Sequence, residues 1–344
     1  MEKGYMSIRS ERKEEHLKLA QMFFNKQKYN SFDQLHLLRP ALPETNVDPT
    51  ILTTEMFNKS VSAPFFINAM TGGSPKSKIV NQALGKVAAK EKIALALGSA
   101  SILAKEDDQL DSFYVARSKN PDGILIVNVN PETPVKAIHK IIQELNADAL
   151  QIHLNTVQEI AMPEGDRDFH WLDNIKEICN QVNIPIIIKE VGFGLDQNTI
   201  HILKNEGIQY FDIAGSGGTN FAQIENARNK NDVSYLEDIG LPTVISALMA
   251  KKEQVNFIVS GGVRNPLDIL KGLTLSGQYI GISNVFLQEF NQNGIDGLEN
   301  LIASWKKQLA ALIAIYGKKD LASLPSIPKY YDLPLKTQIN QLIR

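Results

Sequence analysis

The stretch GILIVNVN (residues 123–130), followed by PVKAIHKIIQEL (134–145) and ALQIHLN (149–155), decides the fold. The first and third segments are continuous apolar runs, which is typical of β-strands buried on both faces of a parallel sheet. The middle segment carries apolar residues at the spacing of one helical face, namely Val135, Ile138, Ile142 and Leu145. Together the three segments predict a strand, a helix and a second strand parallel to the first.

Working outward from this unit, the same alternation continues along the chain. The other apolar runs are APFFINAM (63–70), IALALGS (93–99), IPIIIKE (184–190), YFDIAGS (210–216), NFIVSGG (256–262) and YIGISN (279–284). Eight buried strands separated by helical patterns predict an α/β protein with a closed (β/α)8 TIM barrel. The alternative is an open doubly wound sheet, but no GxGxxG motif follows the first strand.

The composition excludes several classes of protein. Apolar residues make up 43% of the 344 residues, charged residues make up 22%, and the formal net charge is −2. A general nucleic-acid or membrane-surface binder needs a basic field, so we expect neither partner. The single cysteine, Cys179, lies in a helical pattern and is interpreted as a core residue. No apolar run is long enough for a membrane span, and the N-terminus is too charged for a signal peptide, so we expect a cytoplasmic protein.

Three regions of the chain differ in pattern. Residues 1–62 combine a charged helical segment (about 10–26) with the proline-containing stretch RPALPETNVDPT (39–50). We interpret them as an N-terminal helical and extended arm that covers the barrel mouth. Residues 63–316 form the predicted barrel, and residues 317–344 form a turn-rich C-terminal tail.

The predicted strands end in polar and glycine-rich residues. In barrels of this class the chemistry lies at these C-terminal ends. The last two ends, SGG (260–262) and GISN (281–284), occupy the place where such barrels bind phosphate. Glycines let backbone N–H groups approach a phosphate closely, and a following helix N-terminus adds a favourable dipole. The residues alone therefore predict a phosphate-bearing ligand.

Lys189 follows the apolar run IPIII. A buried lysine is costly unless it meets an anion or loses its charge. It could form a Schiff base or place a positive charge beside a flavin ring. A surface lysine is the third possibility.

Gln158 and Glu159 follow His153 and Asn155 after the fourth strand. A lone carboxylate among amides suits Mg²⁺, which proteins often hold with one or two carboxylates plus substrate phosphates. The alternative is a solvated helix start, where an acidic residue is favoured by the dipole.

The arm carries Arg12, Lys13 and His16, and helical spacing places Arg12 and His16 on one face. A charge run such as SERKEEH is typical of a solvated helix.

The motifs taken in order resemble type 2 isopentenyl-diphosphate delta-isomerase. They are RKEEH (12–16), AMTGG (69–73), GS (98–99), HLNTVQE (153–159), KEVGFG (189–194), GSGGTN (215–220) and SGGVRNPLD (260–268). The resemblance runs from about residue 8 to residue 290. HLN-x-x-QE and KE-x-G-x-G are its most specific parts, whereas SGG is shared by many FMN barrels.

The resemblance implies an FMN- and Mg²⁺-dependent enzyme that interconverts isopentenyl and dimethylallyl diphosphate. It implies that the flavin works in its reduced form, supplied by NAD(P)H, and that the chain forms a homo-oligomer, a tetramer or an octamer. The implied FMN contacts are Ala69, Met70, Thr71, Ser99, Asn128, Lys189, Thr219, Gly261, Gly262, Ser283 and Asn284. The implied substrate contacts are Arg12, Lys13, Ser99, His153, Asn155 and Gln158, with Glu159 holding Mg²⁺.

The predicted strand ends offer few side chains suited to moving a proton. His153 is the only clear titrating candidate, because Gln158 cannot titrate and Glu159 is assigned to the metal. We therefore interpret His153 and Gln158 as the catalytic side chains and reduced FMN, through N5, as the proton source.

Three other classes of protein fit these residues less well. An FMN barrel oxidase of 2-hydroxy acids needs a catalytic histidine beside an arginine, and AGSGGTN (214–220) holds neither. An IMP-dehydrogenase-like enzyme needs a nucleophilic cysteine on a loop. A non-catalytic flavin-binding protein needs no metal and diphosphate site, which the resemblance places at Arg12, Lys13, Gln158 and Glu159.

Overall fold

Eight parallel strands close into a barrel in the computed structural model, which describes residues 8–26 and 28–343. Residues 1–7 of the predicted arm and Arg344 of the predicted tail lie outside the described residues. The barrel strands are β4 (Phe65–Ile67), β5 (Leu95–Ser99), β6 (Leu125–Val129), β7 (Ala149–Leu154), β8 (Ile186–Glu190), β9 (Tyr210–Asp212), β10 (Asn256–Ser260) and β11 (Tyr279–Ile282). Closure occurs where β11 pairs with β4. The predicted barrel is confirmed, and the alternative open sheet is excluded.

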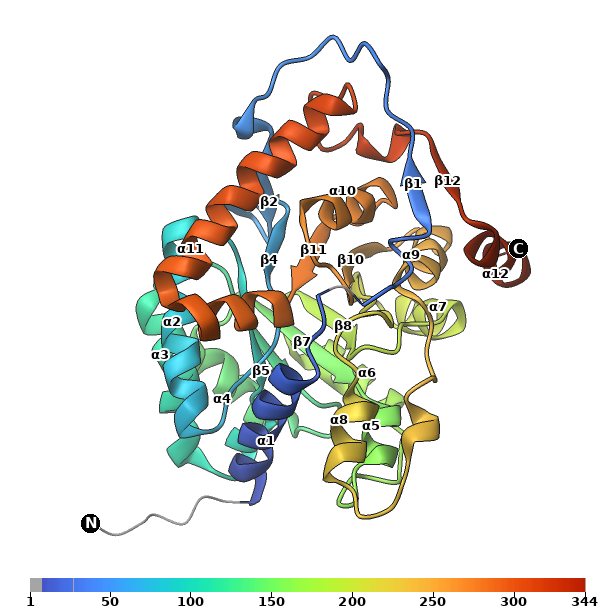
Figure 1. Cartoon of the computed structure of the whole chain (residues 1–344). Helices are drawn as coiled ribbons and strands as arrows, with labels where there is room; N and C mark the ends of the chain where they lie inside the picture. The colour runs from blue at the N-terminus through green and yellow to red at the C-terminus, as the bar shows by residue number, and fades with distance from the viewer. Residues whose placement is uncertain (1–7, 27, 344) are drawn as a thin grey trace.

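Helices surround the barrel (Figure 1). They are α2 (Pro75–Glu91), α3 (Asp111–Lys119), α4 (Val135–Leu145), α5 (Thr156–Ala161), α6 (Leu172–Gln181), α7 (Gln197–Asn205), α8 (Phe221–Arg228), α9 (Thr243–Lys252), α10 (Pro266–Thr274) and α11 (Asn284–Ile315). No described helix is long and apolar enough to cross a membrane.

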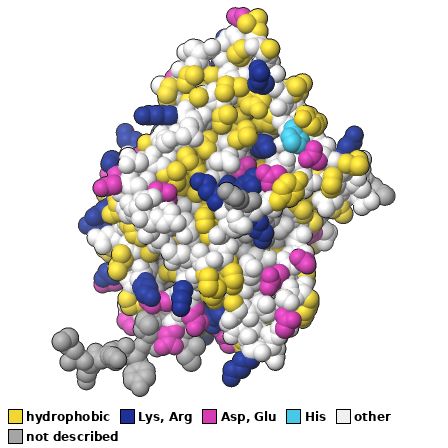
Figure 2. All heavy atoms as spheres, in the orientation of Figure 1, with side chains coloured by type: hydrophobic (Ala, Val, Ile, Leu, Met, Phe, Trp, Pro, Cys, Tyr) yellow, Lys and Arg dark blue, Asp and Glu magenta, His cyan; other side chains and the backbone are white. Residues whose placement is uncertain are grey.

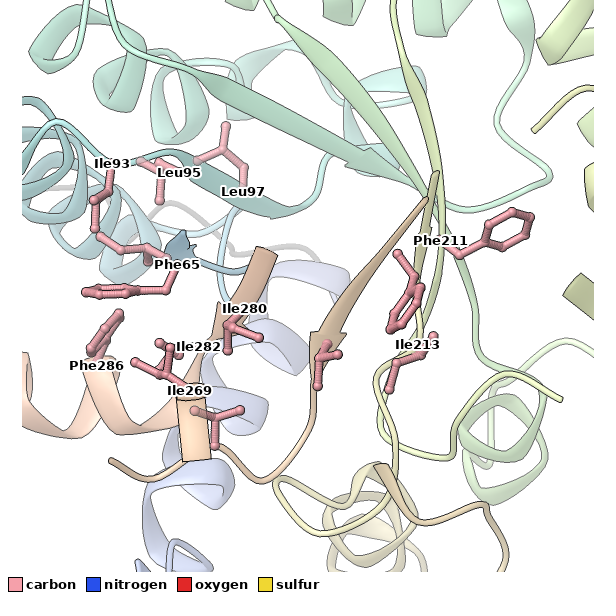
Figure 3. Packing of buried hydrophobic residues seen from close by; sticks show 14 of the residues in the cluster. Phe65, Ile93, Leu95, Leu97, Phe211, Ile213, Ile269, Ile280, Ile282 and Phe286 are labelled. Carbon is pink, nitrogen blue, oxygen red and sulfur yellow. The ribbon is translucent and has the colours of Figure 1, made fainter. Parts of the chain in front are cut away.

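The main core lies between the strands and these helices (Figure 3). Phe65 of β4 faces Phe286 of α11 with ring centroids 6.4 Å apart. Both rings are almost fully buried, and burying an aromatic side chain contributes roughly 1.5–3 kcal/mol.

The arm reaches both ends of the barrel. A hairpin of β2 (Thr54–Met56) and β3 (Lys59–Val61) packs Met56 and Val61 onto the inward-facing side chains at the strands' N-terminal ends. At the opposite end, α1 (Ile8–Met22) lies over the barrel mouth (Figure 1). The hairpin covers the apolar interior of the barrel at the N-terminal ends of the strands, and so keeps these side chains from water.

The C-terminal segment is more regular than the sequence indicates. β12 (Lys329–Tyr331) pairs antiparallel with β1 (Leu35–Leu37) of the arm, and α12 (Leu333–Leu342) follows. Leu335 of α12 is fully buried. This pairing depends on two short segments almost 300 residues apart, so neither shows a strand pattern on its own.

Arg264, just after β10, fixes the arm to the barrel. Its guanidinium lies 2.7 Å from one Asp33 oxygen and 3.0 Å from the other. It also contacts Asp268 of α10 at 2.9 Å. Burial raises the pKa of Asp33, but the hydrogen bonds from Arg264 and from the Asn30 N–H outweigh it and leave this pKa below its ordinary value.

Because the folded-state pKa of Asp33 is lowered, its stabilisation is present above the unfolded value of about 3.9 and is lost as pH falls further. We expect Asp33→Asn to lower the free energy of unfolding at pH 7 by about 1–3 kcal/mol, the worth of a charged hydrogen bond. The difference from wild type should shrink between pH ~5 and pH ~3, as measured by urea denaturation. A difference that stays constant over this range would contradict the assignment.

Candidate active site

One cavity of about 610 Å³ opens at the C-terminal ends of the barrel strands. Its volume lies within the usual range for small-molecule sites. Every residue that the sequence assigns to the site lines it: Arg12, Lys13, Ala69, Met70, Thr71, Ser99, Asn128, His153, Asn155, Gln158, Glu159, Lys189, Thr219, Gly261, Gly262, Ser283 and Asn284. The fold thus gathers residues from positions 12 to 284 of the sequence around one cavity.

Two glycine loops form one wall of the cavity. A Cβ atom on Gly261 would lie 2.0 Å from the Gly215 carbonyl oxygen, and one on Gly218 would lie 2.6 Å from the Gly262 nitrogen. Gly261 also has a φ of +94°, which L-residues rarely adopt. The loops after β9 and β10 therefore pack backbone against backbone.

Helix α11 begins beside these loops. Asn284, its first residue, lines the cavity and donates from Nδ2 to Thr219 Oγ1 at 3.2 Å. The cavity therefore combines closely packed backbone with a helix N-terminus, an arrangement suited to a phosphate group.

Lys189 is the penultimate residue of β8, and its ammonium group faces a carboxylate. Nζ lies 3.3 Å from Asp212 Oδ2 and donates to the Glu190 carbonyl oxygen at 2.9 Å. Asp212 has no exposed surface, so the pair compensates two buried charges. This pairing favours the cationic role of Lys189 over a Schiff base and excludes a surface lysine.

His153 is neutral near neutral pH. Burial, then the positive charges of Lys13 and Lys189, lower the pKa of His153 to about 4. Its Nδ1 lies 2.7 Å from Asn128 Oδ1. The imidazole is therefore a hydrogen-bonding group in the ligand-free protein rather than a charged one.

Helix α5 presents the other polar residues of the β7 end. Asn155 Nδ2 donates to Glu159 Oε1 at 2.7 Å, and the Asp166 N–H donates to Glu159 Oε2 at 2.9 Å. Among the described residues, no group of three His, Cys, Asp or Glu side chains is arranged to hold a metal ion. Glu159 is thus a carboxylate held in place by neutral donors.

Gln158 is buried and oriented by Glu225 of α8. Its Nε2 donates to Glu225 Oε1 at 3.0 Å, which leaves the amide oxygen facing away from that carboxylate. Burial raises the pKa of Glu225, but His16, Gln158 and Arg228 outweigh it, so its pKa is lowered and it is ionised at neutral pH.

The charged face of α1 is turned inward, contrary to the solvated helix that its charge run suggests. Lys13 Nζ donates to the Ser99 carbonyl oxygen at 2.7 Å, and His16 Nε2 lies 2.7 Å from Glu225. Arg12 lies 3.7 Å from the carboxylate of Glu164. The sequence of α1 alone cannot predict these contacts, because the carbonyl and carboxylate partners come from distant elements.

Sequence reasoning missed four buried polar residues of the site: Asn68, Gln151, Asp212 and Glu225. Asp212 carried a usable signal, since it interrupts the apolar run YFDIAGS (210–216) of a predicted buried strand. Glu225 carried none, because an acidic residue on a helix is ordinarily solvated. Cys179 lies on α6 and does not line the cavity, which removes the nucleophile that an IMP-dehydrogenase-like enzyme needs.

The barrel mouth combines a glycine cradle, formed by the packed loops at Gly215–Gly218 and Gly261–Gly262, with a helix N-terminus and a buried lysine. These features together are typical of barrel proteins that bind flavin mononucleotide. In agreement, residues 106–327 match the model of the FMN-dependent dehydrogenase family. Isopentenyl-diphosphate delta-isomerase from Latilactobacillus sakei subsp. sakei (strain 23K) is 38% identical over 338 residues, covering 97% of each chain. The same enzyme from Listeria welshimeri serovar 6b is 38% identical and covers 94% of this chain and 92% of its own. The chain belongs to the FMN-dependent isopentenyl-diphosphate delta-isomerase family.

Solved structures share the fold. A flavocytochrome b2 variant with sulfite bound has a TM-score of 0.66 at 16% identity, covering 96% of this chain and 91% of its own. An (S)-mandelate dehydrogenase mutant has a TM-score of 0.63 at 16% identity, covering 93% and 99%. At this identity the likeness concerns the barrel alone.

Proposed function

We propose that this protein interconverts isopentenyl and dimethylallyl diphosphate in isoprenoid biosynthesis, using reduced FMN and Mg²⁺. The observation that carries the proposal is the meeting, in one cavity, of a phosphate-type cradle, a buried Lys189 and a separate polar wall around Glu159. A protein that binds only a flavin would need the phosphate cradle and Lys189, but not the polar wall. The polar wall, together with Arg12 and Lys13 of α1, supports a second, anionic ligand.

The residues present fit FMN. The backbone at Gly261 and Gly262 and the start of α11 would hold its phosphate, because a glycine has no side chain to keep a ligand from its backbone. Lys189 would place a positive charge near the ring system. Ala69, Met70, Thr71, Ser99, Asn128, Thr219, Ser283 and Asn284 line the remainder of the cavity and complete the proposed contacts.

Glu159 fits Mg²⁺ as a single protein ligand. Each of its oxygens accepts one hydrogen bond and keeps a second lone pair. Mg²⁺ retains several waters and takes substrate phosphates as further ligands, so one carboxylate is sufficient.

The substrate diphosphate is assigned to the wall formed by Arg12, Lys13, His153 and Asn155. Arg12 and Lys13 carry charge opposite to a diphosphate and lie on the helix that covers the mouth. Ser99 also lines the cavity, and its carbonyl oxygen accepts from Lys13 of this wall. Helix α1 would also exclude water from the reacting carbons.

Reduced FMN supplies the proton-transfer chemistry in this proposal. The chain's own part is to hold the allylic carbons in place and to orient the groups around them. Gln158 cannot titrate, so its amide, fixed by Glu225, orients the reacting unit or a water. His153 and the diphosphate wall anchor the other end of the substrate.

We further propose NAD(P)H as the reductant and a homo-oligomer, a tetramer or octamer, as the assembly. The second proposal is supported by exposed hydrophobic side chains on the segments beside β1 and β12. Figure 2 shows hydrophobic side chains gathered on the upper part of this face. On the segments beside β1 and β12, the hydrophobic side chains with large exposed fractions are Leu38, Leu42, Val47, Ile315, Tyr330 and Leu333. Patches of this kind typically pack against a partner.

The proposal is tested by anaerobic incubation with FMN, NADPH, Mg²⁺ and isopentenyl diphosphate. Conversion should require FMN, NADPH and Mg²⁺ together and should fall about a hundredfold in Glu159→Gln, because a metal ligand is lost. Glu164→Gln, a nearby carboxylate on the loop after α5, is the matched control and should retain the Mg²⁺ dependence of wild type. A yellow, FMN-loaded protein without turnover would refute the proposed reaction and leave the flavin site intact.

A further inference from the structure

Five side chains form a continuous line of hydrogen bonds beneath the cavity. Asn68 Nδ2 donates to Asp212 Oδ2 at 2.7 Å, and Gln151 Nε2 donates to Asn68 Oδ1 at 3.2 Å. Asn128 Nδ2 donates to Gln151 Oε1 at 3.1 Å, and His153 Nδ1 lies 2.7 Å from Asn128 Oδ1. The line crosses the barrel from β9 to β7, and its first four members are buried.

The polarity of this line is fixed at its first two members. Asp212 lies 3.3 Å from the Lys189 ammonium and accepts from the Ser260 hydroxyl, and a carboxylate facing these donors acts as an acceptor. Asn68 must therefore turn its NH₂ group toward Asp212. Independently, the backbone N–H of Ala69, which only donates, lies 2.8 Å from Asn68 Oδ1 and fixes the same orientation.

Each later member inherits its orientation from the one before. Because Asn68 offers an oxygen to Gln151, Gln151 donates its NH₂ group and turns its oxygen to Asn128. Asn128 in turn donates its NH₂ group and turns its oxygen to His153. The ring nitrogen that faces an oxygen must carry the proton.

We propose that Asn68, Gln151 and Asn128 are positioning residues that hold His153 as the Nδ1–H tautomer, with an unprotonated Nε2 left for the ligand. We assign the Nε2 edge to the ligand, because His153 lines the cavity and its Nδ1 faces Asn128 Oδ1. Free neutral imidazole side chains prefer the opposite tautomer, Nε2–H. The amide line therefore overrides an intrinsic preference, as hydrogen bonds to one ring nitrogen generally do.

The consequence rests on the proposed function. An unprotonated Nε2 accepts a hydrogen bond from a protonated phosphate oxygen but cannot donate to a fully ionised one. The cavity therefore binds the diphosphate together with one proton, shared between a terminal oxygen and Nε2. Burial lowers the pKa of His153 most, and the charges of Lys13 and Lys189 lower it further; the arriving anion would offset these two charges.

Nitrogen-15 NMR of the ring nitrogens tests the tautomer directly. Full-length, FMN-loaded protein carrying labelled histidine would be measured at pH 7, with the His153 signals assigned from their loss in His153→Gln. We expect a proton on Nδ1 and none on Nε2. A proton on Nε2 in the wild-type protein would overturn the proposal, whatever the variants do.

Gln151→Met cuts the line at its centre with little change in volume, and it should move His153 toward the Nε2–H form. Ser260→Ala removes a donor to Asp212 outside the line and should leave Nδ1–H in place. An unchanged tautomer in a folded Gln151→Met protein would show that the line does not set it. The NMR experiment measures no turnover. A result that contradicts the His153 tautomer is therefore distinct from a result that contradicts the proposed isomerase activity.

Discussion

Replacing Gly261 by alanine is expected to raise the Kd for FMN at least about a hundredfold, the cost of roughly two charged hydrogen bonds. The added methyl would stand 2.0 Å from the Gly215 carbonyl oxygen, so one of the two glycine loops must move. Gly261 also needs a left-handed backbone, which adds strain of about 1–2 kcal/mol for alanine. The backbone N–H groups of the cradle would then no longer converge on one phosphate. Flavin fluorescence titration measures the change.

Gly294→Ala is the matched control for this substitution. Gly294 has a φ of +69° within α11, but nothing lies within 4 Å of where its Cβ would be. It should cost stability through strain alone and leave the Kd for FMN unchanged. Equal losses of FMN affinity in two folded variants would show that strain, and not the cradle, explains the effect.

Replacing Gln158 by leucine is expected to lower kcat by about 10²-fold, the loss that misplacing the reacting unit by about 1 Å can cause. The side chain is buried, and its amide is held by Glu225, so leucine removes a fixed dipole without opening the barrel. The Kd for FMN should not change, because Gln158 lies on the polar wall. Steady-state kinetics under anaerobic conditions would separate kcat from KM.

Thr156→Ala on the same short helix serves as the control, since Thr156 is exposed and outside the cavity lining. It should retain nearly the full kcat. A Gln158→Leu enzyme with a raised KM and an unaltered kcat would assign Gln158 to substrate binding alone.

Much of the barrel is predictable because parallel strands buried on both faces leave a continuous apolar run. IPIIIKE and GILIVNVN needed no partner information to be recognised, and both form barrel strands. The strand ends were predictable for a related reason: polar residues and glycines after a buried strand have few structural uses. Lys189 is the clearest case.

What escaped prediction depends on pairing between distant segments. β1 and β12 are three residues each and exist only because they meet. The inward turn of Arg12 and Lys13 depends on the barrel beneath α1, and the ionised Glu225 depends on His16 and Arg228. The amide line from Asp212 to His153 joins β9, β7, β6 and the residue after β4, and its orientation follows from donors and acceptors that no local pattern contains.

The most direct test of the central claim compares product formed with reductant consumed. The FMN-loaded protein would be reduced once with NADPH, separated from excess reductant under anaerobic conditions, and given isopentenyl diphosphate and Mg²⁺. The account predicts many molecules of dimethylallyl diphosphate for each flavin, with the flavin still reduced at the end. One oxidised product for each flavin, with no dimethylallyl diphosphate, would instead identify an FMN-dependent oxidoreductase and contradict the account.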